Sequence, residues 1–436
     1  MRKYAILTTI LIFLPGMAAL GAVPAASQPA TQSAPAATQA VPAEVTQWLK
    51  AAENLCLAAK EGSPQWDRRD MTIARIALGY AAIGDVDKAN RVAQAVVDER
   101  QRKECIDLIP IQLTHYGYVD RAVAIAKASQ NGRVLSLIAR ISARKDSAKA
   151  LAIASQIDEP RRSSAYAGIA EKQVLQGDLR GAVNTVGLIT VPEERAKSEA
   201  WTAAGTLADD LGDIAKTAAQ RGMDANELAE HLRDILKAKA ARGSMVEARR
   251  ILGMLPKPQD RASGLAAIAE YEIHHASKEQ FSATLQQAAR ETQAIVEAKD
   301  DPFASFVKAA AYFELASLYI QAGDTDLGMK AISEYRRCSL HDPLGVAKGM
   351  GGDKAVLALY IEAGRMEEAT KMAAQADGSL RPEALPIFAG AYAAKGQTAK
   401  VDELLKRNTS DAARCELYLS AAEGAIQRKR SDQEPK

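Results

Sequence analysis

The chain has 436 residues, of which 47% are hydrophobic and 25% are charged, the balance of an ordinary folded protein. Its 56 basic and 54 acidic residues give a formal net charge of +2, which argues against nucleic acid or an anionic membrane surface as a partner. The 4 cysteines show no CxxC spacing, and no HExxH, GxSxG or Walker-type motif occurs. We therefore expect no cofactor, no metal and no catalytic residue.

The first residues have the features of an export signal. Arg2 and Lys3 are followed by an apolar run over residues 4–14, a Pro-Gly break, and small residues at Ala18, Ala22 and Ala25. We predict a signal peptide, or an N-terminal anchor if it is not cleaved, over residues 1–25, because residues 4–23 are long enough to span a bilayer. Both outcomes predict a periplasmic or secreted chain that meets the membrane only through this segment.

The next segments differ sharply in composition. Residues 26–43 are rich in alanine, proline, glutamine, serine and threonine and contain no charge, which is typical of a flexible linker. Helix signals begin at residue 44 and run to residue 60. We predict an α-helical repeat domain over residues 44–427 and a polar tail over residues 428–436.

A helix-turn-helix unit over residues 75–96 recurs along the chain. Apolar residues at spacings of three and four precede Gly84-Asp85, and a second amphipathic helix follows at once. Successive turns are 33, 28, 32, 35, 31, 80, 41 and 32 residues apart, and we expect the step of 80 to contain a degenerate turn near Ala276-Ser277. The turn markers are Gly84, Gly117, Lys145, Gly177, Gly212, Gly243, Gly323, Gly364 and Gly396. Because two short helices cannot enclose a core, the copies must stack on one another.

Small and aromatic residues recur at fixed distances from the turn. Alanine lies five positions after the marker at Ala89, Ala122, Ala150, Ala182, Ala248 and Ala369, and tyrosine four positions before it at Tyr80, Tyr319, Tyr360 and Tyr392. This pattern resembles the tetratricopeptide repeat over residues 69–407, with Trp201 as the family's tryptophan. The resemblance implies an all-α, right-handed superhelical solenoid of about ten helix-turn-helix repeats. The irregular period leaves a HEAT-like α-solenoid as the alternative.

The same resemblance implies an exported, non-catalytic scaffold for protein–protein interaction. In such repeats a protein or peptide partner lies on a concave wall made by the first helix of each unit. The positions carried over to that wall are Glu104, Asp107, Glu171, Thr202, Asp209, Arg233, Lys237, Phe313, Gln321 and Lys354. The alternative is an extracytoplasmic enzyme of cell-wall or polysaccharide metabolism, which would need a cleft with two carboxylates about 5–10 Å apart.

Two other features predict local structure. Cys56, Cys105, Cys338 and Cys415 are expected to be unbridged and mostly buried, because the repeats separate them by more than the roughly 7 Å between Cα atoms that a disulfide allows. Residues 279–299 and 304–322 contain no internal helix breaker, so this unit should have longer helices than its neighbours.

Overall fold

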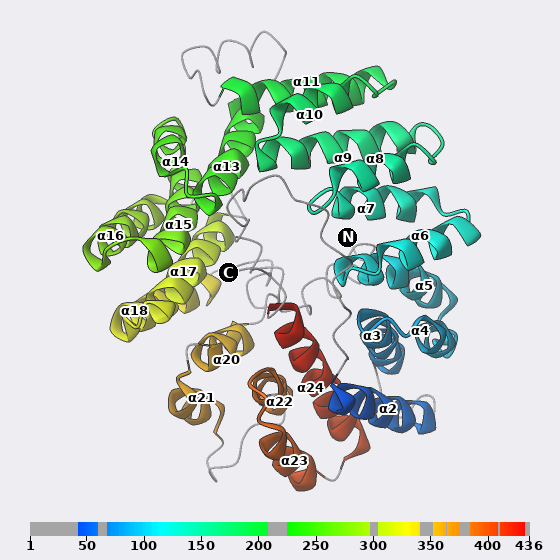
Figure 1. Ribbon diagram of the computed structural model, residues 1–436. Coiled ribbons are helices and arrows are strands. Elements are labelled where there is room, and N and C mark those ends of the chain that lie inside the picture. Colours follow the sequence, from blue (N-terminus) through cyan, green and yellow to red (C-terminus); the bar gives the residue numbers. More distant parts are fainter. Residues whose placement is uncertain are drawn as a thin grey trace. The chain divides into compact units, whose positions relative to one another are not determined.

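A computed structural model describes residues 42–59, 68–207, 225–296, 304–340, 352–362, 364–374, 384–408 and 410–431 (Figure 1). All regular elements in these ranges are α-helices, which confirms the predicted all-α class. The predicted export signal, the turn marker Gly212 and the wall residue Asp209 lie outside the described residues. Within the described part of the chain, no helix combines the length and the hydropathy that crossing a bilayer requires.

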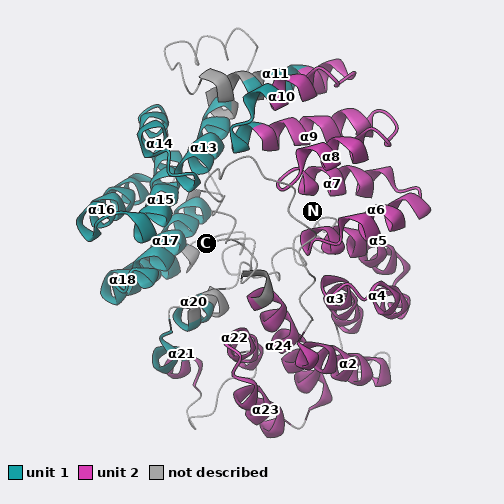
Figure 2. Ribbon diagram, in the orientation of Figure 1, with its two compact units in different colours: residues 1–30, 174–180, 196–369 teal, residues 31–173, 181–195, 370–436 magenta. Residues whose placement is uncertain are grey.

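The chain divides into two compact units, coloured separately in Figure 2. Unit 1 consists of residues 1–30, 174–180 and 196–369, and unit 2 of residues 31–173, 181–195 and 370–436. Unit 2 is therefore discontinuous, because the segments that build it come from both ends of the chain.

The helices follow one another as hairpins joined by short turns. Unit 2 contains α2 (Ala43–Ala58), α3 (Arg69–Ala82), α4 (Val86–Ala93), α5 (Glu99–His115), α6 (Val119–Ala128), α7 (Gly132–Ser142), α8 (Ser147–Ala154), α22 (Leu385–Ala394), α23 (Thr398–Arg407) and α24 (Asp411–Ser431). Unit 1 contains α13 (Ala225–Ala241), α14 (Met245–Leu252), α15 (Pro258–His275), α16 (Lys278–Ala294), α17 (Ala304–Gln321), α18 (Thr325–Leu340) and α20 (Gly352–Glu362). Residues of both units occur in α9 (Arg161–Gln176), α10 (Leu179–Val186), α11 (Pro192–Leu207) and α21 (Met366–Ala373). The last helix, α24, continues past the predicted end of the repeat domain at residue 427.

The predicted turns are confirmed by their backbone. The glycine markers at 84, 117, 177, 243, 323, 364 and 396 all have positive φ angles, between 71° and 87°. After Gly84 the Asp85 N–H donates to the Tyr80 carbonyl (2.9 Å), and the Asp85 carboxylate accepts from the Lys88 N–H (3.1 Å). The turn expected at Ala276-Ser277 is also present, since Ser277 caps α16 by accepting from the Gln280 N–H (3.2 Å).

Small residues bring the two helices of each hairpin together, as the pattern predicted. The side chain five positions after the turn is completely buried in Ala89, Ala122, Ala150, Ala182, Ala248 and Ala369. Tyr80, Tyr319 and Tyr360 are buried as well, whereas Tyr392 is half-buried. The Tyr80 hydroxyl donates to Glu53 Oε2 (2.7 Å). In the unit predicted to be longer, α16 has 17 residues, against 8 in α14 and 16 in α18, and α17 has 18, the same as α15. The predicted extra length is therefore found only relative to α14.

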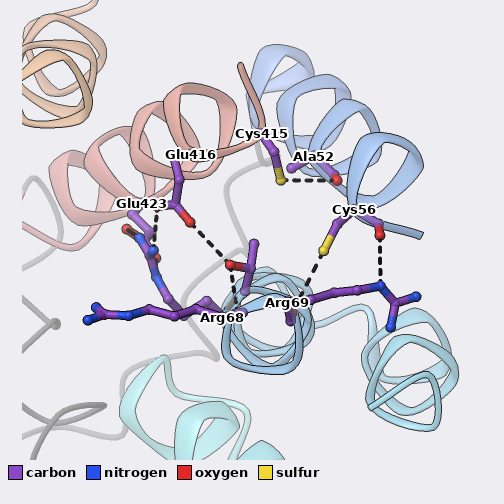
Figure 3. Close-up of polar contacts among 9 residues, drawn as sticks. Ala52, Cys56, Arg68, Arg69, Cys415, Glu416 and Glu423 are labelled. Atoms are coloured by element: carbon purple, nitrogen blue, oxygen red, sulfur yellow. Dashed lines mark hydrogen bonds and ion pairs between the residues drawn. The ribbon is translucent and has the colours of Figure 1, made fainter. Parts of the chain in front are cut away.

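The last helix of unit 2 packs against its first ones, α2 and α3. The Arg75 guanidinium on α3 forms ion pairs with Glu416 Oε2 (2.8 Å) and Glu423 Oε2 (2.9 Å) of α24, more than 340 residues later in the chain. Thr72 adds a hydrogen bond to Glu416 Oε1 (3.2 Å). Figure 3 shows α24 beside α2 and α3 at this contact. Residues from both ends of the chain thus share one packed interface.

Candidate functional site

Three first helices, α13, α15 and α17, lie next to one another in unit 1 and form one wall (Figure 1). Their second helices α14, α16 and α18 pack against them as the other layer. A groove of about 350 Å³ lies on the wall. Its lining consists of Ala229, Glu230, Arg233, Lys257, Gln259, Asp260, Ser263, Phe306, Val307, Ala310, Ala311 and Glu314.

One side of the groove is apolar and comes from α17. Phe306, Val307, Ala310 and Ala311 recur at spacings of three and four, so they share one face of the helix. Glu314 lies two turns after Val307 on the same face and ends the apolar strip. This side of the groove could therefore accept an apolar side chain next to a carboxylate.

A buried ion pair joins the other two helices of the wall. The Arg233 guanidinium on α13 contacts Asp260 Oδ1 on α15 at 3.2 Å, and Asp260 is only 6% exposed. A carboxylate buried to this extent needs a hydrogen-bonded cation, because burying it unpaired would be costly. Arg233 therefore holds α13 against α15 and keeps part of its own surface in the groove.

A second set of charges adjoins the groove. Burial raises the pKa of Glu314, the negative charge of Glu270 raises it further, and the cations Lys237 and Arg233 oppose the shift. Glu270 is in contact with solvent, but it loses part of its hydration in the fold, and this loss raises its pKa. The positive charges of Lys237 and His274 act in the opposite direction and lower it. Lys237 thus acts on both carboxylates at once.

The predicted wall residues that belong to unit 2 form hydrogen bonds or ion pairs with nearby residues of the same unit. Glu104 accepts from Arg100 Nε at 3.0 Å, and Asp107 accepts from Nδ2 of Asn131, the residue that caps α7, at 2.9 Å. Glu171 pairs with the adjacent Lys172 at 2.5 Å. These three residues thus serve local contacts within unit 2.

Two of the predicted wall residues are corrected by the structure. Thr202 is 5% exposed and its hydroxyl donates to the Ser198 carbonyl (2.8 Å), so it does not lie on an accessible surface. The Phe313 ring packs against Tyr335 of α18, with 5.4 Å between ring centroids, and therefore faces the second layer of helices. Gln321 is exposed, and its side-chain amide donates to Ser317 Oγ (3.1 Å). Lys354 lies in α20, but its side chain is not among the described parts of the structure.

Sequence reasoning identified Arg233 and Lys237 but missed Asp260, Glu270 and Glu314. The sequence of α17 contains a pattern that could have identified Glu314. It lies seven residues after Val307 and seven before the predicted wall residue Gln321, and residues two turns apart share a helix face. Among the described residues there is no cluster of three or more histidine, cysteine or acidic side chains that could bind a metal ion.

A larger hollow of about 660 Å³ lies between α16, α17 and α18 in unit 1. Its buried cation, Lys308, donates to the carbonyls of Gln293 (3.4 Å) and Ile295 (3.0 Å) at the end of α16. Because a cation near a helix C-terminus stabilises the helix dipole, Lys308 has a structural role here. The groove on the α13–α15–α17 wall remains the better candidate.

No protein-family model matches the chain, and no curated protein matches it. One similar solved structure is described as "Circular tandem repeat protein with novel repeat topology and enhanced subunit contact surfaces". The alignment has 13% sequence identity, covers 90% of this chain and 97% of that one, and has a TM-score of 0.21.

Proposed function

We propose that this protein is an exported, non-catalytic repeat scaffold that binds an extended segment of a partner protein on the α13–α15–α17 wall. The observation that supports the proposal is the groove itself, in which an apolar strip from α17 lies beside charged side chains from α13 and α15. Mixed apolar and charged lining with few polar anchors is typical of peptide recognition.

The charges of the wall favour a basic partner segment. Four carboxylates line or adjoin the groove, Glu230, Asp260, Glu270 and Glu314, against three cations, Arg233, Lys237 and Lys257. Since Asp260 is already neutralised by Arg233, the excess negative charge falls on the other carboxylates. A lysine or arginine placed next to Glu314, with an apolar neighbour on α17, would be complementary to this arrangement.

Two further elements of the proposal come from the sequence. The buried alanines and tyrosines around left-handed turn glycines support a tetratricopeptide-like repeat. The charge, apolar run and small residues within residues 1–25 support export by a signal peptide or anchor.

The test is selection of short random peptides on the immobilised full-length chain, followed by affinity measurements on the enriched peptides. We expect enriched peptides to combine a basic residue with a leucine, valine or aromatic residue. The double substitution Glu270→Gln and Glu314→Gln should weaken their binding at least tenfold, a change worth about 1.4 kcal/mol. Ala310→Arg should weaken it as well, by placing a large cation on the apolar strip.

The matched control is Glu279→Gln, which removes an exposed carboxylate from α16, outside the groove lining. This variant should bind the peptides as the wild type does. If the enriched peptides contain no basic residue, or if the double Gln variant binds them unchanged, this groove is not the recognition surface.

A second candidate function has one observation in its favour. Glu270 and Glu314 are two interacting carboxylates with raised pKa values on one wall, as an acid–base enzyme would require. Against it, Phe306 is the single aromatic residue among the groove's described lining, whereas glycan clefts stack sugars on several. Release of reducing ends from cell-wall glycan, lost in Glu314→Gln, would establish the enzyme and displace the scaffold proposal.

A further inference from the structure

Two cysteines that are far apart in the sequence meet between α2 and α24. Cys56 and Cys415 are both fully buried, and the Cys415 thiol donates to the carbonyl of Ala52, 363 residues earlier and one turn before Cys56 (3.4 Å). Ala52 and Cys56 are four residues apart and therefore share one face of α2, and the Cys56 thiol donates to the Arg69 carbonyl of α3 (3.8 Å). Figure 3 shows the Cys415 sulfur next to the Ala52 carbonyl and the Cys56 sulfur directed toward Arg69.

We propose that Cys56 and Cys415 form a redox modification site, at which oxidation to a disulfide covalently joins the first described helix of the chain to the last. No sequence pattern pairs them, because the repeats between them place them at opposite ends of the repeat domain. In the structure both are thiols, which is the reduced form of this site.

Of the two buried thiols, Cys56 is the one that deprotonates more easily. The hydrogen bond from Cys415 lowers the pKa of Cys56, and the positive charge of Arg69 lowers it further against the effect of burial. Arg69 is held in place because its Nε donates to the Cys56 carbonyl at 3.3 Å. The pKa of Cys415, in contrast, is raised, so this thiol stays protonated until the second step.

The reaction needs a disulfide as the oxidant, either a small molecule such as oxidised glutathione or a protein disulfide. The Cys56 thiolate attacks one sulfur of the oxidant, forms a mixed disulfide and releases one thiol. Cys415 then loses its proton, attacks Cys56 Sγ and releases the second thiol. Two electrons and two protons thus pass from the cysteine pair to the oxidant, which is reduced to two thiols.

The neighbouring ion pairs bring the helices together over the two thiols, so an external oxidant reaches Cys56 before this contact forms or when it opens. Glu416 follows Cys415 directly and pairs with Arg75 of α3, so α24 is already docked where Cys415 reaches α2. Cys105 provides an internal comparison. Like Cys56 it is buried and its thiol donates to a backbone carbonyl, that of Ala74 (3.9 Å), but burial alone acts on it and raises its pKa to about 12.

The test uses the full chain, prepared reduced and then treated with oxidised glutathione in two arms, one folded throughout and one refolded with the oxidant present. The intact mass should fall by two hydrogen atoms, and a digest should contain the Cys56 peptide linked to the Cys415 peptide. Thermal unfolding of the oxidised protein should shift up by about 5 °C, because the bond closes a very long loop, and reductant should reverse the shift.

Two variants separate this bond from general thiol oxidation. Cys105→Ser with Cys338→Ser should still form the link and show the shift, whereas Cys56→Ser with Cys415→Ser should show neither. The proposal is overturned if neither arm links Cys56 to Cys415, if Cys56 stops at the mixed disulfide, or if the links formed involve Cys105, Cys338 or a second copy of the chain.

Discussion

At Gly424, α24 approaches α22 so closely that no side chain fits between them. A Cβ atom at this position would lie 2.7 Å from the carbonyl carbon and 2.9 Å from the Cα of Gly390, and would overlap its carbonyl oxygen. Ordinary Cβ contacts begin at 3.4 Å, and the atoms in the way are backbone. Gly424→Ala must therefore push the two helices apart, at a cost of about 1–3 kcal/mol for overpacking.

The gain in helix propensity from glycine to alanine offsets about 0.5–1 kcal/mol of this cost. A net loss of about 1 kcal/mol corresponds to a fall of about 2–4 °C in the thermal midpoint for a unit of this size. Thermal unfolding followed by far-UV circular dichroism measures the shift. The control is Gly132→Ala in the same unit, where the nearest atom to the new Cβ is 3.5 Å away, so its midpoint should stay the same or rise. If Gly424→Ala melts at or above the wild-type midpoint, the helices are not in backbone contact here and the reasoning is wrong.

Three further predictions concern other described contacts. Arg75→Ala should destabilise the chain by about 2 kcal/mol in urea unfolding at neutral pH, because it leaves two partly buried carboxylates without their cation. Burial raises the pKa of Glu423, so the loss of stability in Arg75→Ala should be smaller at acidic pH, where Glu423 is protonated. An equal loss of stability at neutral and acidic pH would contradict the prediction. Hydrogen bonds from Thr190, then Ser163 and Arg162, lower the pKa of Glu159 from its ordinary value of 4.5 to about 2. The ionised Glu159 carboxylate therefore stabilises the fold at pH values above 4.5, and this stabilisation is lost as the pH falls from 4.5 to about 2. An NMR titration should show Thr190→Val moving that pKa upward, and an unchanged value would rule out the Thr190 contact. Ala248→Leu should lower stability by about 1–3 kcal/mol, since Ala248 is completely buried, and an unchanged melting temperature would show that the hairpin has room for a larger side chain.

The hairpins could be read from the sequence because their signals are local. Gly84 and its counterparts adopt positive φ, which glycine tolerates best, and the alanine five residues later permits close helix packing, so both leave a visible pattern. The docking of α24 on α2 and α3 left no such pattern. Arg75 resembles any other helical arginine in the sequence, and nothing near it indicates that its partners lie more than 340 residues away.

The candidate site was only partly predictable for a geometric reason. The expected wall was placed on the first helix of each hairpin, and of its residues Arg233 lines the groove while Lys237 acts on the charge of Glu314. Phe313 is next to Glu314 in the sequence, but one residue rotates a side chain by about 100° around a helix, which turns Phe313 toward α18. The charge pair between Arg233 and Asp260 joins two repeats, and its partners cannot be matched without knowing how the repeats stack.

The discontinuity of unit 2 determines the order in which the protein can be completed. During synthesis α2 emerges among the first helices, but α24 is made last, after the whole of unit 1. The buried residues of α2 that face α24 must wait for it, because segments that fold as one unit require all of their parts. A chain released before residue 411 would expose that surface permanently. We therefore expect nascent or truncated chains to be the form most dependent on chaperones and most exposed to proteolysis.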